Sequence, residues 1–273
     1  MSEPTRAELM RVVALLEERH GVGVRGDDLP GWLEERLKSS VQALLASQRL
    51  DAQSLLAKLE AEPDLVIELA NALRVGETRF YRDAAQWEAL RRSVLPGMLE
   101  RRGDAQPVMA LSAGCSTGEE AWTLAMLLSE GSQRRGRVRV LGVDRSEPAL
   151  VTARLAVYDA ASQQHLPADL AQRYLMPAVD GSVRVVPELQ PLVTFQCRDL
   201  AGDMPPGRYA IIVCKNVLIY FGDEAQDALV QALLRALSDD GVLLVARSEI
   251  PIVRSLGARA HEIAPGITAF RSH

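Results

Sequence analysis

The spacing of apolar and polar positions divides the chain into two parts with different patterns. Up to about residue 75, apolar residues recur at helical spacing, beginning with Leu9, Val12, Val13, Leu15 and Leu16. A turn at 21–31, rich in Gly, Asp and Pro, separates this stretch from further helical patterns at 32–50, 52–60 and 64–73. The pattern predicts a small helical bundle. Such a bundle either caps the rest of the chain or recognises a partner helix, and periodicity alone does not separate these two interpretations.

Continuous apolar runs replace the helical pattern after residue 107. Runs at 108–113, 138–143, 192–197, 209–214, 242–246 and 267–271 predict strands, and amphipathic segments at 121–128, 147–158 and 223–237 predict helices between them. Segment 159–191 lacks this rhythm, but residues 182–186 alternate after Asp180-Gly181 and predict a hairpin. The sequence therefore predicts an α/β fold with a doubly wound, Rossmann-like sheet.

Composition narrows the class of protein. The 273 residues are 48% hydrophobic and 25% charged, as in soluble globular proteins, and the net charge of −5 argues against broad affinity for nucleic acid. Cys115, Cys197 and Cys214 are widely spaced, so we expect neither disulfides nor a metal site, and we expect the last two to be core thiols. No apolar run reaches the roughly 18 residues of a membrane span, and the N-terminus lacks the basic and apolar regions of a signal peptide. We therefore expect a cytoplasmic protein without membrane insertion.

The loop after the first predicted strand carries the most specific chemistry. Ala113 and Gly114 lead into small residues, and Glu119 and Glu120 then open a helix. Two carboxylates there would repel a pyrophosphate but would suit an ammonium or sulfonium group. Asp144 ends the next strand, where a carboxylate can accept hydrogen bonds from ribose hydroxyls. A nucleoside with a cationic tail and no phosphate is S-adenosylmethionine, although the acid pair would also complement the helix dipole by itself.

Other polar residues follow predicted strands and would meet at the same edge of the sheet. Ligands of open α/β sheets bind outside the carboxyl ends of strands. This rule places 113–118, Asp144, 199–200 and 215–220 around one predicted binding site. Tyr220 either contributes to this site or hydrogen-bonds backbone at its rim.

Segment 76–83, GETRFYRD, places two aromatics between Arg79 and Arg82. It either grips a ligand or is a linker whose aromatics plug a domain boundary.

Five motifs, taken together and in order, resemble the chemotaxis receptor methyltransferases of the CheR type. They are ETRFYRD (77–83), SAGCSTGEE (112–120), GVDRSEPAL (142–150), CKNVLIYF (214–221) and ARSE (246–249), and the likeness covers roughly residues 5–273. The resemblance implies an enzyme that transfers methyl groups from S-adenosylmethionine to glutamate carboxylates on the cytoplasmic helices of chemoreceptors. The products would be glutamate methyl esters and S-adenosylhomocysteine.

The resemblance also implies the domain organisation and the site. It places an N-terminal helical domain at 1–75, a linker contributing to the cofactor site at 76–90, and the S-adenosylmethionine-binding methyltransferase domain at 91–273, with a small antiparallel β-subdomain inserted at about 156–195. Glu119 would contact the amino group of the methionine part and Asp144 the ribose, and Arg82 and Tyr220 are the expected catalytic residues. The implied cofactor-binding set is Thr78, Arg82, Ala113, Gly114, Glu119, Asp144, Asp199, Leu200, Lys215, Asn216 and Tyr220.

Departures from the family pattern concern the protein substrate more than the cofactor. Gly76 stands where the family usually has Asn, and ARSE stands where it has Gly-His-Ser-Glu. The helix WLEERLKSSV is partly acidic where relatives carry a basic helix, which bears on the protein substrate. The loop 176–181 is short, so we expect action independent of a receptor pentapeptide. We also expect a monomer. A methyltransferase of another protein or a small molecule, and a non-catalytic S-adenosylmethionine-binding signalling protein, remain alternatives.

Overall fold

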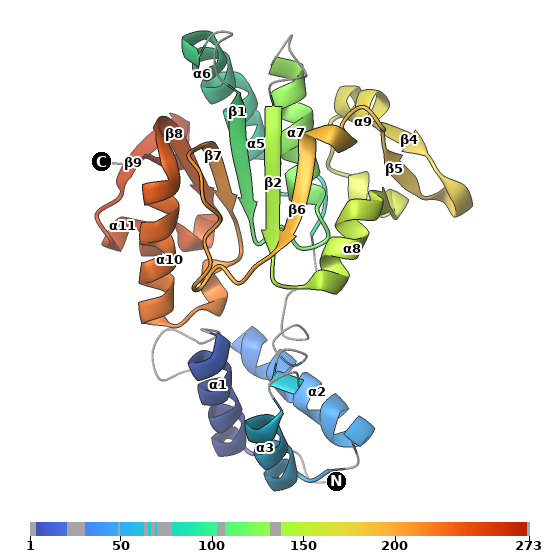
Figure 1. The fold of residues 1–273 in the computed structure, drawn as a ribbon, viewed down its shortest axis with the longest axis vertical. Coiled ribbons are helices and arrows are strands. Elements are labelled where there is room, and N and C mark those ends of the chain that lie inside the picture. Colours follow the sequence, from blue (N-terminus) through green and yellow to red (C-terminus); the bar gives the residue numbers. More distant parts are fainter. Residues whose placement is uncertain are drawn as a thin grey trace. The chain divides into compact units, whose positions relative to one another are not determined.

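A computed structural model describes residues 4–20, 31–48, 50–62, 65–66, 69, 78–102, 107–131 and 138–271 (Figure 1). The chain forms two compact units. The first comprises Met1–Gly76 with Leu218–Ala228, and the second comprises Glu77–Val217 with Leu229–His273. Residues 21–30 of the turn predicted at 21–31, most of the predicted helix at 64–73, and Gly76 lie outside the described residues.

The first unit is built from the helices α1 (Arg6–His20), α2 (Gly31–Gln48) and α3 (Ala52–Ala61). Asp51 begins α3 by accepting a hydrogen bond from the Ser54 backbone N–H at 2.8 Å, which satisfies one of the unpaired donors of a helix start. Apolar side chains at helical spacing form the core of this unit, among them Leu9, Leu16, Leu37, Leu45 and Leu59. The helical patterns predicted at 32–50 and 52–60 are confirmed.

The second unit is organised around a seven-stranded mixed sheet with the strand order β6-β2-β1-β7-β8-β10-β9. The parallel strands are β1 (Val108–Ala113), β2 (Val138–Asp144), β6 (Val193–Cys197), β7 (Tyr209–Cys214) and β8 (Leu237–Val245). Two antiparallel strands, β10 (Ile267–Arg271) and β9 (Arg259–Ala264), complete it. The sheet confirms the predicted Rossmann-like α/β fold. Sequence analysis missed β9 because polar residues interrupt its apolar ones and none of its residues is buried.

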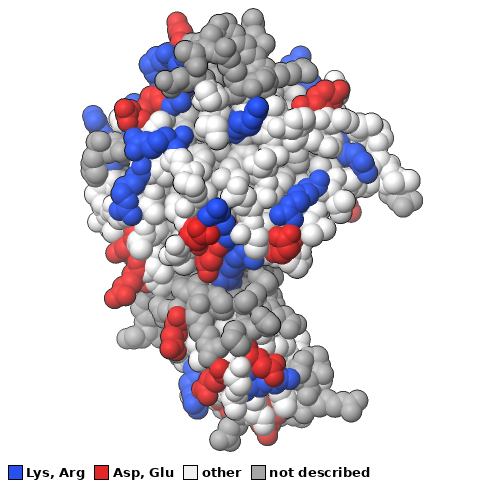
Figure 2. All heavy atoms as spheres, in the orientation of Figure 1, with Lys and Arg blue, Asp and Glu red and all other residues white. Residues whose placement is uncertain are grey.

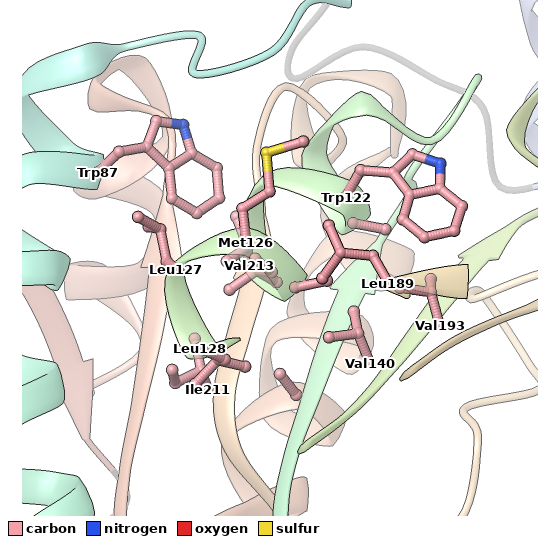
Figure 3. Close-up of a cluster of buried hydrophobic side chains, with 14 of the residues drawn as sticks. Trp87, Trp122, Met126, Leu127, Leu128, Val140, Leu189, Val193, Ile211 and Val213 are labelled. Carbon is pink, nitrogen blue, oxygen red and sulfur yellow. The ribbon is translucent and has the colours of Figure 1, made fainter. Parts of the chain in front are cut away.

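Helices connect and cover the strands (Figure 1). They are α5 (Ala84–Ala89), a π-helical turn at Leu90–Val94, α6 (Leu95–Arg102), α7 (Glu119–Gly131), α8 (Glu147–Leu155), α10 (Asp223–Ala236) and α11 (Ile250–Ser255). The core includes side chains of α7, such as Trp122 and Met126, and sheet residues such as Val140 and Val213 (Figure 3). This apolar layer fixes the start of α7 relative to the strand ends.

The prediction of one helix over 147–158 was wrong at its end. Ala156 adopts the left-handed conformation, with φ +54°, and stops α8 at Leu155. Val157–Tyr158 then forms β3, which pairs with β5 (Val183–Val185). The helical spacing of apolar residues continues across the stop, so the sequence pattern does not mark it.

A second, three-stranded antiparallel sheet has the order β3-β5-β4. β4 (Leu175–Pro177) follows α9 (Ala168–Tyr174), and its pairing with β5 confirms the predicted hairpin. Gly181 forms the turn between them with φ +75°. This small sheet lies within the segment that the resemblance assigns to a β-subdomain.

Of the two cysteines predicted to be core thiols, one is buried and one is exposed. Cys214 is buried in β7, and Cys115 is also buried. Cys197 is exposed, so its prediction as a core thiol was wrong. The physical reason is its position at the end of β6, an edge strand whose last two residues are exposed.

The surface carries charges of both signs. Figure 2 shows acidic and basic side chains interspersed over the described part of one face, as the formal net charge of −5 suggests. Within the described ranges, no helix has both the length and the apolar character to cross a bilayer. The same ranges contain no group of three His, Cys, Asp or Glu side chains placed to hold a metal ion.

Candidate functional site

The loop between β1 and α7 approaches two neighbouring strands closely. Gly114 has φ +78°, and a Cβ there would lie 2.4 Å from Cγ2 of Val217, just beyond β7. The backbone N–H groups of Gly114 and Cys115 both donate to the Val143 carbonyl of β2, at 2.8 and 2.9 Å. Because β1 lies between β2 and β7, this loop occupies the point where the strand order reverses. Open α/β sheets bind their ligands at that point.

Asp144 joins the loop to the element that follows β2. The residue is 3% exposed, and its two carboxylate oxygens accept hydrogen bonds from the backbone N–H groups of Ser116 at 2.9 Å and Ser146 at 2.8 Å. Asp144 therefore fixes the loop to the end of β2.

Glu119 is a desolvated carboxylate with neutral partners at the start of α7. It is 5% exposed, and its side chain accepts a hydrogen bond of 2.7 Å from the Thr117 hydroxyl. The Thr78 hydroxyl also hydrogen-bonds it. Burial raises the pKa of Glu119, and these hydrogen bonds partly offset the rise. Such a group favours a ligand that brings a positive charge.

Glu120 has different surroundings, although it is the next residue. It accepts a hydrogen bond from the Ser112 hydroxyl at 2.8 Å and lies 4.0 Å from the ammonium of Lys215. Burial raises the pKa of Glu120, and the charges of Lys215 and Arg82 act in the opposite direction. The two adjacent acids therefore have different electrostatic surroundings. Glu120 has cations nearby, and Glu119 has hydroxyl partners.

Segment 78–83 is anchored by its aromatic residues. Phe80 and Tyr81 are 0% and 1% exposed and belong to the core of the sheet unit. The Phe80 N–H donates to the Ser162 carbonyl at 3.1 Å, and the Tyr81 N–H donates to the Thr123 hydroxyl at 3.2 Å. The aromatics therefore anchor this segment in the core of the sheet unit, while Thr78 is the residue that contacts Glu119.

The chain beyond β7 depends on a residue that sequence analysis did not select. Glu249 is fully buried, and its carboxylate accepts hydrogen bonds from the backbone N–H groups of Asn216 (3.0 Å), Val217 (2.8 Å) and Ala246 (2.9 Å). Asn216 has φ +58°, so this main-chain path needs support. The signal for Glu249 in the sequence was the ARSE motif. The first two residues of this motif depart from the family pattern, but its glutamate is kept.

Two other predicted positions follow β6. Asp199 forms a turn, in which its carboxylate accepts from the Ala201 N–H at 3.0 Å, and Leu200 is 7% exposed. The Arg198 N–H donates to the Asp144 carbonyl at 3.1 Å. The turn after β6 is therefore bound to the end of β2.

The structure gathers ten of the eleven predicted positions in the sheet unit, around the carboxyl ends of its central strands and the segment before α5. These are Thr78, Arg82, Ala113, Gly114, Glu119, Asp144, Asp199, Leu200, Lys215 and Asn216. Tyr220 belongs to the other compact unit and packs against the core of its helices. Its role at the site stays a prediction.

Comparison with known proteins gives a consistent set of relatives. A family model described as CheR methyltransferase, SAM binding domain, matches residues 76–254, more than half of the chain. A chemotaxis protein methyltransferase of Borreliella burgdorferi is 27% identical over 252 residues, covering 90% of this chain and 88% of that protein. A probable biofilm formation methyltransferase, WspC, of Pseudomonas putida is 29% identical over 264 residues, 96% of this chain and 61% of the relative. A chemotaxis protein methyltransferase of Vibrio parahaemolyticus is 30% identical over 192 residues, 68% of this chain and 69% of the relative.

Proposed function

The chain belongs to the CheR methyltransferase family, and from that premise we propose that it methylates glutamate side chains on the cytoplasmic helices of chemoreceptors. Membership makes it an S-adenosylmethionine-dependent methyltransferase, which confirms the predicted family and cofactor. The glutamate substrate and the receptor partner are the part we propose. Relatives described as chemotaxis methyltransferases support this function over a different substrate or a non-catalytic role.

The surroundings of Glu119 are the observation that carries the proposal. A buried carboxylate with hydroxyl partners at a helix start fits the ammonium of the methionine part of the cofactor, whereas a pyrophosphate would be repelled. By the family resemblance, Asp144 matches the acid that binds the ribose, and Asp199 and Leu200 match positions that hold the adenine. By the same resemblance, Lys215 and Asn216 match strand-end positions that would lie near the methyl group. The residues present therefore fit the cofactor.

Catalysis of this methyl transfer depends more on positioning the reacting groups than on proton transfer. The bound cofactor supplies an electrophilic methyl group on a sulfonium. A glutamate carboxylate is already ionised near pH 7, so the chain needs no strong general base. We assign to Arg82 and Tyr220 the orientation of that incoming carboxylate and the exclusion of water. Arg82 must not bind the carboxylate too tightly, since its charge is neutralised in the transition state.

The expected partner is a receptor helix, approached by a monomer in the cytoplasm. The short connection between β4 and β5, residues 178–182, supports action without a receptor pentapeptide. The domain boundaries proposed are 1–75 for the helical domain, 76–90 for the linker and 91–273 for the catalytic domain.

Transfer of labelled methyl groups tests this function. The full chain, S-adenosylmethionine with a labelled methyl group, and cytoplasmic fragments of the host's receptors should give labelled receptor, and mild base should release the label as methanol, as a glutamyl methyl ester does. A Tyr220→Phe variant should methylate more slowly, by about tenfold or more for a lost orienting contact.

Two outcomes would contradict the proposal. Label that survives mild base would point to another acceptor group. Binding of S-adenosylhomocysteine without any transfer to the receptor fragments would point to a non-catalytic role. A Tyr220→Phe variant with the normal rate would remove Tyr220 from the mechanism.

A further inference from the structure

Lys215 is a buried cation that contacts the segment before α5, the helix α5 itself and α7. Its side chain is 3% exposed. The ammonium donates to the Arg82 carbonyl at 2.8 Å and lies 3.3 Å from the Asp83 carboxylate and 4.0 Å from that of Glu120. It also lies 4.8 Å from the centre of the Trp87 ring. These neighbours give the ammonium one hydrogen bond, two opposite charges and an aromatic face.

The Arg82 carbonyl is the point on which two donors converge. Besides Lys215, the indole N–H of Trp87 donates to it at 2.7 Å. The residues on either side, Tyr81 and Asp83, have φ +59° and +62°. Residues with a Cβ disfavour this left-handed conformation. The two hydrogen bonds to the Arg82 carbonyl, which lies between Tyr81 and Asp83, therefore help to keep the main chain in that conformation.

The charge of Lys215 is tolerated in this place because it is matched. A buried cation needs an opposite charge and hydrogen bonds to offset its lost hydration. Asp83 and Glu120 supply the charge, the Arg82 carbonyl supplies the hydrogen bond, and the face of Trp87 adds a cation–π contact. The ammonium is therefore committed to the protein itself.

We propose that Lys215 is a positioning residue, which fixes the main chain at 81–83 and thereby places the Arg82 side chain at the cofactor site. The inference rests on the proposed function in one respect, the assignment of Arg82 to cofactor binding. The sequence resemblance implied that Lys215 contacts the cofactor directly. In the present inference Lys215 acts on the cofactor site through Arg82 instead. Trp87 supports the same carbonyl from the other side.

A double-mutant cycle on the full chain tests this assignment. Lys215→Met keeps most of the side-chain volume and removes the charge and the donors. It should weaken the binding of S-adenosylhomocysteine, measured by calorimetry, by about tenfold. In an Arg82→Ala background the same substitution should cost less than about twofold, because the residue through which it acts is gone. The KM for S-adenosylmethionine should rise more than kcat falls.

Three further variants exclude a merely structural role. Trp87→Phe keeps an aromatic ring and loses the N–H, so it should weaken binding in the same direction and also lose that effect without Arg82. Lys215→Arg keeps the cation and should restore most of the affinity. Lys58→Met, at an exposed ion pair with Glu62, controls for the change in net charge and should bind normally. Thermal unfolding of each variant identifies any that fail to fold, in which case Trp87→Phe provides the cycle.

Unchanged affinity in Lys215→Met, or equal losses with and without Arg82, would overturn the inference. If Arg82→Ala binds as tightly as the wild type, the proposed role of Arg82 fails and the inference fails with it. If the wild type binds S-adenosylhomocysteine but leaves receptor fragments unmodified, the proposed substrate fails while the cycle still decides the role of Lys215.

Discussion

At the scale of single residues, Glu119 and Glu120 show how neighbours in sequence acquire different chemistry. Glu120 lies near the ammonium of Lys215, and Glu119 has hydroxyl partners, with its pKa raised by burial. A raised pKa in the folded state means that the native protein binds this proton more tightly than the unfolded chain does. The contribution of Glu119 to the free energy of unfolding therefore declines as the pH rises from the usual glutamate range through the raised pKa.

Replacing Glu119 by Gln should separate cofactor binding from stability. The variant should bind S-adenosylmethionine at least about tenfold more weakly at pH 7, because the charge that attracts the ammonium is lost. Its free energy of unfolding without cofactor should equal or exceed that of the wild type, because no buried charge remains to be desolvated. Calorimetry and urea unfolding measure the two quantities.

The pH dependence of binding gives a control for the same residue. Wild-type affinity should fall as the pH is lowered through the raised pKa of Glu119, and the Glu119→Gln variant should lack that decline. A variant less stable than the wild type by more than about 1 kcal/mol would show that the hydrogen bonds of the carboxylate outweigh its desolvation.

At the scale of elements, the turn between β1 and α7 is limited by a neighbouring loop. Gly114 combines φ +78° with a Cβ position 2.4 Å from Val217, whereas Gly181, in the β4–β5 turn, has φ +75° and open space. The two glycines therefore share one backbone requirement and differ in crowding. Comparing substitutions at the two glycines therefore isolates the effect on stability of the close approach between the β1–α7 loop and the loop after β7.

Alanine at these two glycines should destabilise the chain to different degrees. Gly181→Ala should cost about 1–2 kcal/mol for the left-handed conformation, and Gly114→Ala should cost a further 1–3 kcal/mol or so for overpacking. Adding Val217→Ala to Gly114→Ala should recover part of the difference. Urea unfolding measures all three, and equal losses at the two glycines would contradict the crowding argument.

The elements that could be predicted from the sequence are those with a continuous apolar run. β7 occupies its predicted range because burial on both faces demands apolar side chains. β10, which is only partly buried, also occupies its predicted range. β9 escaped prediction because an exposed edge strand tolerates polar residues, and the end of α8 was missed because a backbone conformation at Ala156 marks it. The contacts of Lys215 with Arg82 and of Glu249 with Asn216 join distant parts of the chain, so local pattern carries no signal for them.

At the scale of the whole molecule, the chain does not divide at one point into two contiguous domains. The unit of the N-terminal helices includes Leu218–Ala228, which contains Tyr220 and the start of α10. The sheet unit contains the other predicted site residues. A ligand at the ends of β1, β2 and β6 should therefore affect the local stability of the two units differently.

Hydrogen exchange with saturating S-adenosylhomocysteine tests this difference. Amides of residues 114–118, 144–146 and 198–200 should exchange more slowly, since they line the strand ends, while those of α3 should change little. At a free concentration of 100 times Kd the ligand should add about 2.7 kcal/mol to the free energy of unfolding. Equal slowing in α3 would show that the two units open together.

The exposure of Cys197 gives the protein a chemical handle. All three cysteines are free thiols, and the other two are buried, so a maleimide dye would attach selectively to the end of β6. Cys197 is the ladder partner of Asp144, which places such a dye beside the carboxylate proposed to bind the ribose. Partial desolvation at the strand end and the nearby carboxylates of Glu147 and Asp144 raise the pKa of the thiol, so labelling proceeds faster in mildly alkaline buffer. The native chain can therefore carry a fluorescent reporter of cofactor arrival without any engineered cysteine.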